Sequence, residues 1–236
     1  MLIIPNFKTM KFTYYGHSCF SVEIKGKAIL FDPFITYNEL AKNVNIETIP
    51  ADYIFISHGH QDHIADAVSI AKRTGATCVA NFEVATWLNK NGVEKTLPLN
   101  QGGPINFDFG TVRGTNAVHS SGLPDGSYGG NPLGFLFTTE EGNFYFAGDT
   151  ALTMDMQLIP VWANINFAVL PIGGHFTMDA ADALKAAEFT KTNTVIGVHY
   201  DTFGFIKIDK SAVTELFKAE GKNILLPAIG ETITIN

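Results

Sequence analysis

The sequence predicts an α/β fold in which strands and helices alternate along one chain. Short apolar segments of strand length recur throughout the 236 residues, and several segments between them carry apolar side chains at helical spacing. The composition is 46% hydrophobic and 17% charged, which is enough apolar material for a sizeable core. This length fits one large domain. We therefore expect a single domain over residues 1–236, with residues 1–9 as an N-terminal extension that contributes little to the core.

The first third of the chain predicts a run of strands followed by a helix. Strands are expected at residues 11–15, 20–24, 28–31 and 53–56. Gly16-His17-Ser18 forms the turn between the first two, and Asp32-Pro33 ends the third, because proline cannot continue a β-ladder. Apolar residues from Ile64 to Ala71 then recur at helical spacing, and Gly75 is placed to end that helix.

The rest of the chain continues the alternation. Further strands are expected at residues 77–80, 104–109, 111–118, 134–139, 143–147, 166–171 and 194–198, with one more at the C-terminus. Further helices are expected at residues 82–90, 179–191 and 209–220. Asp179 can cap the second of these helices. The alternation predicts mixed layers of helices and strands.

Three histidines and one aspartate lie within six residues directly after the strand expected at 53–56. His58 and His60 can point the same way from an extended segment, whereas Asp62 and His63 lie where the chain turns into a helix. Imidazole and carboxylate groups are common ligands of divalent metals. The alternatives are an exposed loop without metal or a closed structural zinc site. So many polar groups at the mouth of a buried strand do little for stability alone, and we predict a metal site.

The pattern His-x-His-x-Asp-His after an apolar strand resembles the signature of the metallo-β-lactamase superfamily. The resemblance covers about residues 11–235 and implies a four-layer αββα sandwich, two mixed β-sheets flanked by helices. It also implies a His, an Asp and a final His at later strand ends, and His119, Asp149 and His199 occur in that order. Singly, these three would be ordinary half-buried histidines and a turn residue. Residues 30–33, Leu-Phe-Asp-Pro, resemble the first motif of the family.

The resemblance implies two divalent metal ions and a hydrolytic reaction. One ion would be held by His58, His60 and His119, and the second by Asp62, His63 and His199, with Asp149 bridging. Zinc is the expected metal, with manganese or iron as alternatives. Metal-bound hydroxide would attack a small ester, lactone or phosphodiester, with Asp62 and Asp149 as catalytic carboxylates. The alternative is a non-catalytic metal-binding or sensor protein on the same fold.

Two histidines remain, each beside glycine. His175 is expected as a catalytic residue that protonates the leaving group, and both His17 and His175 are candidate substrate-binding residues. Structural histidines held by hydrogen bonds are the alternative. Gly16-His17-Ser18 and residues 173–178 are similar to segments of small hydrolases related to ascorbate-6-phosphate lactonase.

Charge and composition limit the partners. The net charge of −7 argues against nucleic acid, which needs a broad basic face. Bound metal would still attract a small anion, so we expect a small-molecule substrate, in some cases anionic. The sequence has neither a secretory signal nor a membrane-spanning run, which predicts a cytoplasmic protein without a membrane partner. Cys19 and Cys78 are expected to be buried free thiols, and a homo-oligomer is expected.

Overall fold

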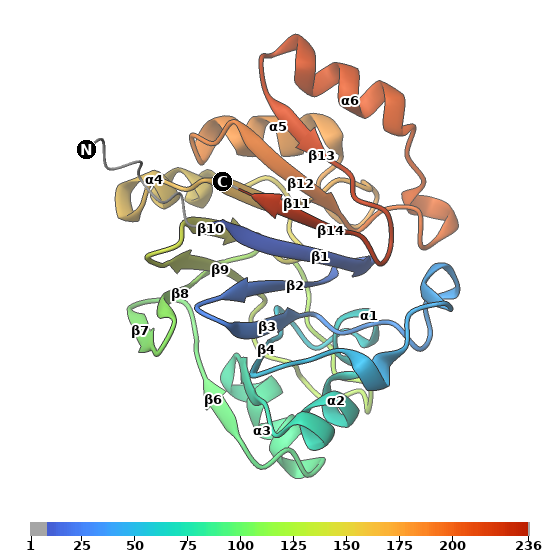
Figure 1. Ribbon diagram of the computed structural model, residues 1–236, viewed down its shortest axis with the longest axis vertical. Helices are drawn as coiled ribbons and strands as arrows, with labels where there is room; N and C mark the ends of the chain where they lie inside the picture. Colours follow the sequence, from blue (N-terminus) through green and yellow to red (C-terminus); the bar gives the residue numbers. More distant parts are fainter. Residues whose placement is uncertain (1–8, 236) are drawn as a thin grey trace, which may run out of the picture.

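Figure 1 shows the computed structural model of the chain, which describes residues 9–235. The predicted extension at residues 1–9 lies, apart from Thr9, outside the described residues. The strands form two seven-stranded mixed sheets. Within the described part of the chain, no helix has both the length and the apolar character needed to cross a membrane.

The first sheet is built from the N-terminal half of the chain and the last strand. Its order is β14 (Thr232–Ile235), β1 (Met10–Gly16), β2 (Cys19–Ile24), β3 (Lys27–Phe31), β4 (Tyr53–Phe55), β5 (Thr77–Ala80) and β6 (Thr96–Pro98). The pairs from β14 to β3 are antiparallel, and those from β3 to β6 are parallel.

The second sheet repeats this plan with the other half of the chain. Its order is β13 (Asn223–Leu225), β12 (Thr194–Val198), β11 (Phe167–Pro171), β10 (Asn143–Phe146), β9 (Leu133–Thr138), β8 (Gly110–Asn116) and β7 (Pro104–Phe107). The pairs from β7 to β10 are antiparallel, and those from β10 to β13 are parallel.

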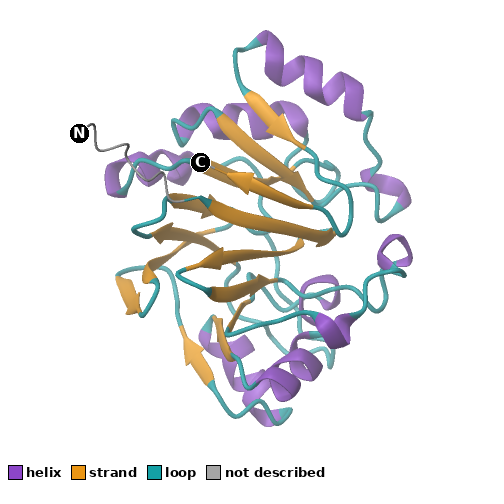
Figure 2. Ribbon diagram, viewed as in Figure 1, coloured by secondary structure: helices purple, strands orange, loops and turns teal. Residues whose placement is uncertain are grey.

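Helices cover the outer face of each sheet, as Figure 2 shows above and below the strands. The first sheet carries α1 (Gln61–Ile64), α2 (Ala67–Thr74) and α3 (Phe82–Lys90), and the second carries α4 (Ile159–Trp162), α5 (Ala180–Phe189) and α6 (Lys210–Ala219). Short 3₁₀ helices lie in the connections: η1 (Glu39–Ala41), η2 (Ile46–Thr48), η3 (Met154–Leu158) and η4 (Gly204–Ile206).

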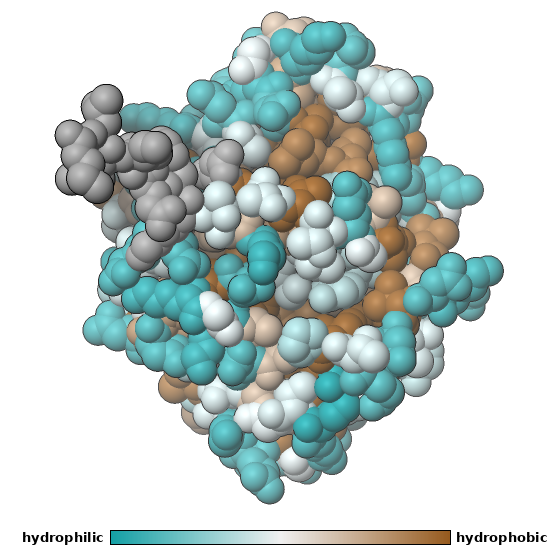
Figure 3. Space-filling model, in the orientation of Figure 1, coloured by the Kyte–Doolittle hydropathy of each residue, from teal (hydrophilic) through white to brown (hydrophobic). Residues whose placement is uncertain are grey.

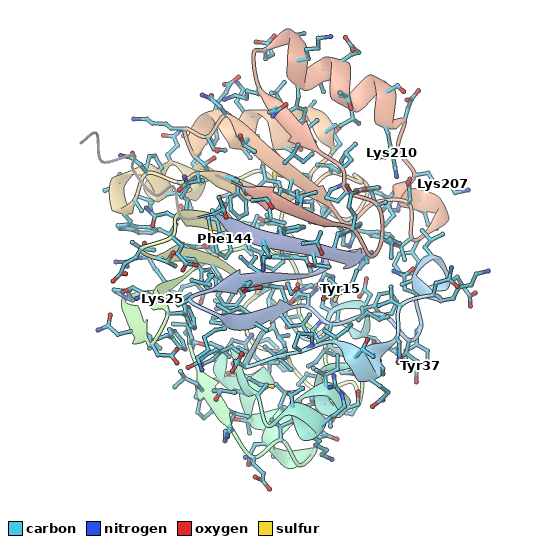
Figure 4. All side chains as sticks on the ribbon, viewed as in Figure 1. Tyr15, Lys25, Tyr37, Phe144, Lys207 and Lys210 are labelled. Carbon is cyan, nitrogen blue, oxygen red and sulfur yellow. The ribbon has the colours of Figure 1, made fainter. Side chains whose placement is uncertain are left out.

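Strand alternation explains the layers, because successive side chains point to opposite faces of a sheet. In β10, Phe144 and Phe146 belong to the core between the sheets, whereas Tyr145 packs under the helices of the second sheet. In β3, Phe31 faces the inter-sheet core and Leu30 faces the helices of the first sheet. Phe144, labelled in Figure 4, lies within this inner layer. The αββα sandwich expected from the sequence is confirmed.

Several details differ from the expected elements, among them the short helix α4, which was not expected. The single helix expected from Ile64 is broken into α1 and α2, because the N–H of Asp66 donates to the carbonyl oxygen of Pro33 instead of continuing the helical ladder. The single C-terminal strand is two strands, β13 and β14, in different sheets. The three-residue strand β6 was not expected, and its Thr-Leu-Pro sequence is too short to show a period.

Candidate metal centre

The predicted metal-binding residues lie at one edge of the sandwich because each of them follows a strand that ends at this edge. Asp32 follows β3, and the segment from Ser57 to His63 follows β4, which is parallel to β3. In the second sheet, Asp149 follows β10 and His199 follows β12, two strands that run in the same direction. His119 follows β8 at the same edge. Carboxyl ends of parallel strands therefore bring residues far apart in sequence together.

The backbone is unusual at several of these positions. His17, Asp32 and His199 have φ angles of +54°, +40° and +56°, a left-handed backbone conformation that residues other than glycine rarely adopt. Hydrogen bonds hold two of them: the N–H of His199 donates to the carbonyl oxygen of His17 over 2.9 Å, and the Tyr14 hydroxyl donates to the same oxygen. Strain of this kind persists where the surrounding structure fixes it, as at functional sites.

One group of ligand atoms comes from His58, His60 and His119. Their nitrogen atoms all lie within 4.8 Å of one another. The Nε2 atom of His58 is 2.9 Å from the Nδ1 atom of His60, and the rings of both lie 5.1 Å from the ring of His119. His58 is fully buried, whereas the other two are partly open to solvent. These three imidazoles could share one cation.

Asp149 connects this group with a second one. Its Oδ2 atom lies 2.9 Å from Nε2 of His199, 3.2 Å from Nε2 of His63 and 3.8 Å from Nε2 of His119. The carboxylate is 2% exposed. One buried oxygen thus faces imidazoles from three different segments, which is the position that a bridging ligand requires.

The second group contains His17, Asp62, His63 and His199, whose ligand atoms also lie within 4.8 Å of one another. The Oδ2 atom of Asp62 is 3.9 Å from Nε2 of His63 and 3.1 Å from Nε2 of His17. The other ring nitrogen of His17 is 3.0 Å from the hydroxyl of Thr202. His17 is 1% exposed, so it lies beneath the carboxylate of Asp62 and away from solvent. The sequence singled out His17 but gave no sign of Thr202, which is 185 residues away.

Asp32 and Ser57 orient the histidines. One oxygen of Asp32 lies 2.8 Å from Nδ1 of His63 and accepts from the Ser57 hydroxyl, and the other accepts from the Ser57 N–H. The Ser57 hydroxyl is also 2.9 Å from Nδ1 of His58. Because these contacts occupy the Nδ1 sides, the Nε2 atoms face the centre of the site, as in metal sites whose ligands are fixed by outer hydrogen bonds. Ser57 was missed as a functional residue, although it directly precedes the histidine cluster.

The electrostatics favour a cation among these groups. Burial lowers the pKa of His58, His60 and His119, and it lowers that of His17 to about 4, so these imidazoles keep a free lone pair at neutral pH. Burial opposes ionisation of Asp149, but His199 and His63 hold its pKa well below the ordinary value.

His63 shows the opposite shift. Burial opposes its charge, yet Asp149, Asp62 and Asp32 hold the pKa of this imidazole well above the ordinary value. Positive charge is therefore favoured at this point of the site, and a divalent metal can take the place of the proton.

Unpaired polar atoms show that the residues fit a metal. Among residues 9–235, Nε2 of His63, Oδ1 of Asp149 and Nδ1 of His199 are buried and make no aligned hydrogen bond, although Nε2 of His63 lies 3.2 Å from Oδ2 of Asp149. Leaving such atoms unpaired costs about 1–3 kcal/mol each. A divalent cation at the centre would give the first two a partner, and imidazole with carboxylate is a donor set that suits zinc, manganese and iron.

The centre opens into a cavity of about 1060 Å³. The residues that it shares with the centre are His60, Asp62, His119, Asp149 and His199. His17 is not among the lining residues. His175 is exposed at the rim, where its ring stacks on Phe205 with centroids 4.9 Å apart. Within the described residues, the side chain of His175 makes no hydrogen bond or ion pair. The structure does not bring His175, a predicted catalytic residue, together with the residues of the metal centre.

Known proteins with similar sequences show the family to which the chain belongs. Residues 27–200 match the family described as Beta-lactamase superfamily domain. A UPF0173 metal-dependent hydrolase of Flavobacterium johnsoniae is 47% identical over 226 residues, which cover 96% of this chain and 100% of that protein. One from Christiangramia forsetii is 49% identical over 227 residues, with the same coverage.

Two solved structures extend the comparison. Igni18, a metallo hydrolase from the hyperthermophilic archaeon Ignicoccus hospitalis, is 35% identical with a TM-score of 0.87, covering 97% of this chain and 99% of that one. An isothiocyanate hydrolase from Delia radicum gut bacteria is 21% identical with a TM-score of 0.79, covering 95% and 98%, and shows the shared fold alone. The chain therefore belongs to the beta-lactamase superfamily, and within it to the UPF0173 metal-dependent hydrolases.

Proposed function

We propose that the chain hydrolyses a small ester, lactone or phosphodiester with two divalent ions at this site. One ion is assigned to His58, His60 and His119, and the second to Asp62, His63 and His199, with Asp149 shared between them. The observation that carries the proposal is the position of Asp149, whose Oδ2 atom lies 2.9–3.8 Å from imidazole nitrogens of three histidines on separate segments. A carboxylate in this position could act as a ligand to two neighbouring cations.

The metals would supply one part of the chemistry and the chain the rest. When bound, a pair of divalent ions lowers the pKa of water toward neutrality and polarises a carbonyl or phosphoryl oxygen. Asp149 and Asp62 both line the cavity, so their carboxylates can orient a water beside the scissile bond and accept its proton. Asp32 would orient the imidazole of His63, and Ser57 would orient that of His58. His17 would orient the carboxylate of Asp62. His175, at the rim, is proposed to contact the part of the substrate farthest from the reacting atoms.

The opening of the site favours an enzyme over a protein that only binds metal. Structural zinc sites are closed by four protein ligands, whereas catalytic sites keep an open position for water and substrate. Here His60, Asp62 and His119 reach the wall of a large cavity. Zinc is the proposed metal because three of the assigned ligands of the first ion are imidazoles, and manganese and iron remain alternatives.

The test combines metal analysis with turnover. Protein purified from cells supplied with zinc, manganese and iron is expected to hold about two ions per chain. It should hydrolyse an ester, a lactone or a phosphodiester from a panel, lose this activity on chelation and recover it with one of the three metals. Asp149→Ala should lower turnover by at least about a hundredfold.

A substitution far from the metal centre serves as the control. Asp108 lies at the far end of β8 from His119, so Asp108→Asn should keep full metal content and activity. Metal that binds with no turnover of any substrate would favour the sensor alternative, and full activity of Asp149→Ala would remove the shared carboxylate from the account.

A further inference from the structure

Aromatic side chains surround the entrance of the metal-site cavity. Phe34 and Phe203 line it with Tyr37, Phe176 and Phe205. Tyr37 is 65% exposed and Phe205 72% exposed. Figure 3 shows hydrophobic side chains at the surface near the right-hand margin of the molecule, over the η4 segment that carries Phe205. Scattered exposed apolar residues need no explanation, but several around one cavity mark a binding surface.

The rings come from separate segments, and two pairs of them lie close together. Phe34 and Tyr37 follow β3, Phe176 follows β11, and Phe203 and Phe205 lie at η4. Phe205 lies 6.3 Å from Phe176 and stacks on His175, and Phe203 lies 6.4 Å from Phe34. Three different connections thus build one apolar wall beside the metal centre.

Among residues 9–235, no lysine or arginine lines the same cavity. Its charged or ionisable lining groups are Asp62, Asp149, His60, His119 and His199, which belong to the metal centre, and the phenol of Tyr37. The lysines that follow η4 do not line the cavity: Lys210 lies 3.6 Å from the carboxylate of Asp201 and over the ring of Tyr200. Figure 4 shows Lys207, which follows η4, and Lys210, at the start of α6, away from Tyr37. Within the described residues, a substrate anion outside the metal centre would therefore meet aromatic rings and the imidazole of His175 at the rim, but no lysine or arginine.

We infer that the substrate is an uncharged ester or lactone with an aromatic or bulky apolar group seated against Phe203, Phe205 and Tyr37. This inference rests on the proposed function and replaces the anionic substrate that the sequence suggested. In the reaction, the oxygen of water bonds to the carbonyl carbon while the carbon–oxygen bond to the alcohol breaks. The electron pair leaves with the alcohol oxygen, which takes a proton, and the products are an acid and an alcohol.

A matched pair of esters tests the inference on the metal-loaded protein. Benzyl butyrate and ethyl butyrate share the acyl group and differ in the aromatic ring, and bis(p-nitrophenyl) phosphate adds aromatic rings to an anion. We expect benzyl butyrate to have a KM about three- to tenfold below that of ethyl butyrate, since one aromatic contact contributes about 0.5–1.5 kcal/mol beyond its buried area. Phe205→Ala should raise the KM of benzyl butyrate by a similar factor, and this rise should exceed both the change in its kcat and the rise in the KM of ethyl butyrate.

A control variant and a mass measurement separate the alternatives. Phe82 is 57% exposed on α3 and lines no part of this cavity, so Phe82→Ala should change neither KM. Equal KM values for the two butyrates, or a faster reaction with the phosphodiester, would overturn the inference while leaving metal-dependent hydrolysis intact. A drop in molar mass by light scattering for Phe205→Ala, with KM unchanged, would assign the aromatic wall to a second copy of the chain. Failure of every substrate would remove the proposed function itself.

Discussion

At the residue scale, the position of His17 assigns it a supporting role. Its imidazole bridges the carboxylate of Asp62 and the hydroxyl of Thr202, and it lies outside the cavity lining. We propose that it acts through Asp62, as a positioning residue for the proposed second ion. Removing an outer hydrogen bond of this kind weakens metal binding by about 10–100-fold in other sites.

His17→Asn tests this role. Asparagine tolerates the left-handed backbone at this position, but its side chain is too short to keep both contacts. We expect the second ion to bind about 10–100-fold more weakly, measured by titration of the chelated protein, while the first ion binds as before. Lys25→Asn is the matched control, because Lys25 also has a left-handed backbone, with a φ of +49°, but lies in the β2–β3 turn. Equal loss in both variants, or loss in neither, would contradict the role of His17.

The two cysteines predict an alkaline response. Both are buried free thiols, as expected from the sequence. Burial raises the pKa of Cys78 to about 12 and that of Cys19 well above its ordinary value. The unfolded chain releases these protons near pH 9, whereas the folded chain keeps them, so their contribution to stability is present below that pH and is lost as the pH rises toward 12.

A thiol reagent and a pH series measure this. At pH 8 the native protein should react with a disulfide reagent at least about a hundredfold more slowly than the unfolded chain, since the thiolate is the reactive form. The free energy of unfolding should decrease between pH 9 and the highest pH at which the fold persists. Fast labelling of either cysteine in the native state would show that its burial is wrong.

At the element scale, the turn between β10 and Asp149 depends on Gly148. Its φ is +63°, and a Cβ atom there would lie 2.4 Å from the carbonyl oxygen of Leu133 and 3.0 Å from Cβ of Ser57. Gly148→Ala should therefore cost at least about 2 kcal/mol in unfolding free energy, from backbone strain together with overpacking. Chemical denaturation measures this. Gly126 also has a positive φ, of +83°, but open space around it, so Gly126→Ala should cost only about 1–2 kcal/mol. Equal costs would mean that the crowding at Gly148 relaxes freely.

The elements best predicted from the sequence are those with a clear period and clear ends. The helix Phe82–Lys90 matches its expected range, with Asn81 as the N-cap and Asn91-Gly92 after its end. The strand β4 and the histidine cluster after it lie where the sequence places them. The break at Asp66 depends on the carbonyl of Pro33, and the passage of the chain from β13 to β14 depends on which sheet edge is free. Both are tertiary effects that a local pattern does not contain.

Some residues of the site could be predicted from the sequence, and others could not. The resemblance to a known family predicted that seven side chains would meet, and the structure brings all seven together. The contact of Thr202 with His17 and the wall formed by Phe34, Phe176 and Phe205 join segments far apart in the chain. No spacing or motif predicts these contacts, because each of these residues is common in its local sequence context. His175 is the opposite case, because the glycine beside it suggested a functional residue, whereas the structure places it at the rim.

At the scale of the whole molecule, metal binding should be coupled to stability. The proposed ligands come from both sheets, so a cation bound among them would hold the two halves of the sandwich together. At a free metal concentration about a hundred times the dissociation constant, binding contributes about 2.7 kcal/mol, which corresponds to about 5–10 °C in melting temperature for a chain of this size. Thermal unfolding with and without chelator measures the shift. Asp149→Ala should show a smaller shift, and an equal shift in both proteins would place the stabilising ion elsewhere.

The assembly and cellular location of the protein stay predictions. They are a homo-oligomer and a cytoplasmic location. The exposed aromatic wall is the surface for which oligomerisation and substrate binding are competing uses, and molar mass in solution distinguishes them.

Anomalous diffraction from crystals grown with zinc would locate the metal ions. We expect two strong peaks at the edge of the sandwich, one among His58, His60 and His119 and one among Asp62, His63 and His199, with the carboxylate of Asp149 between them. A protein that binds no metal under these conditions, or binds it away from these seven side chains, would disprove the proposed metal centre.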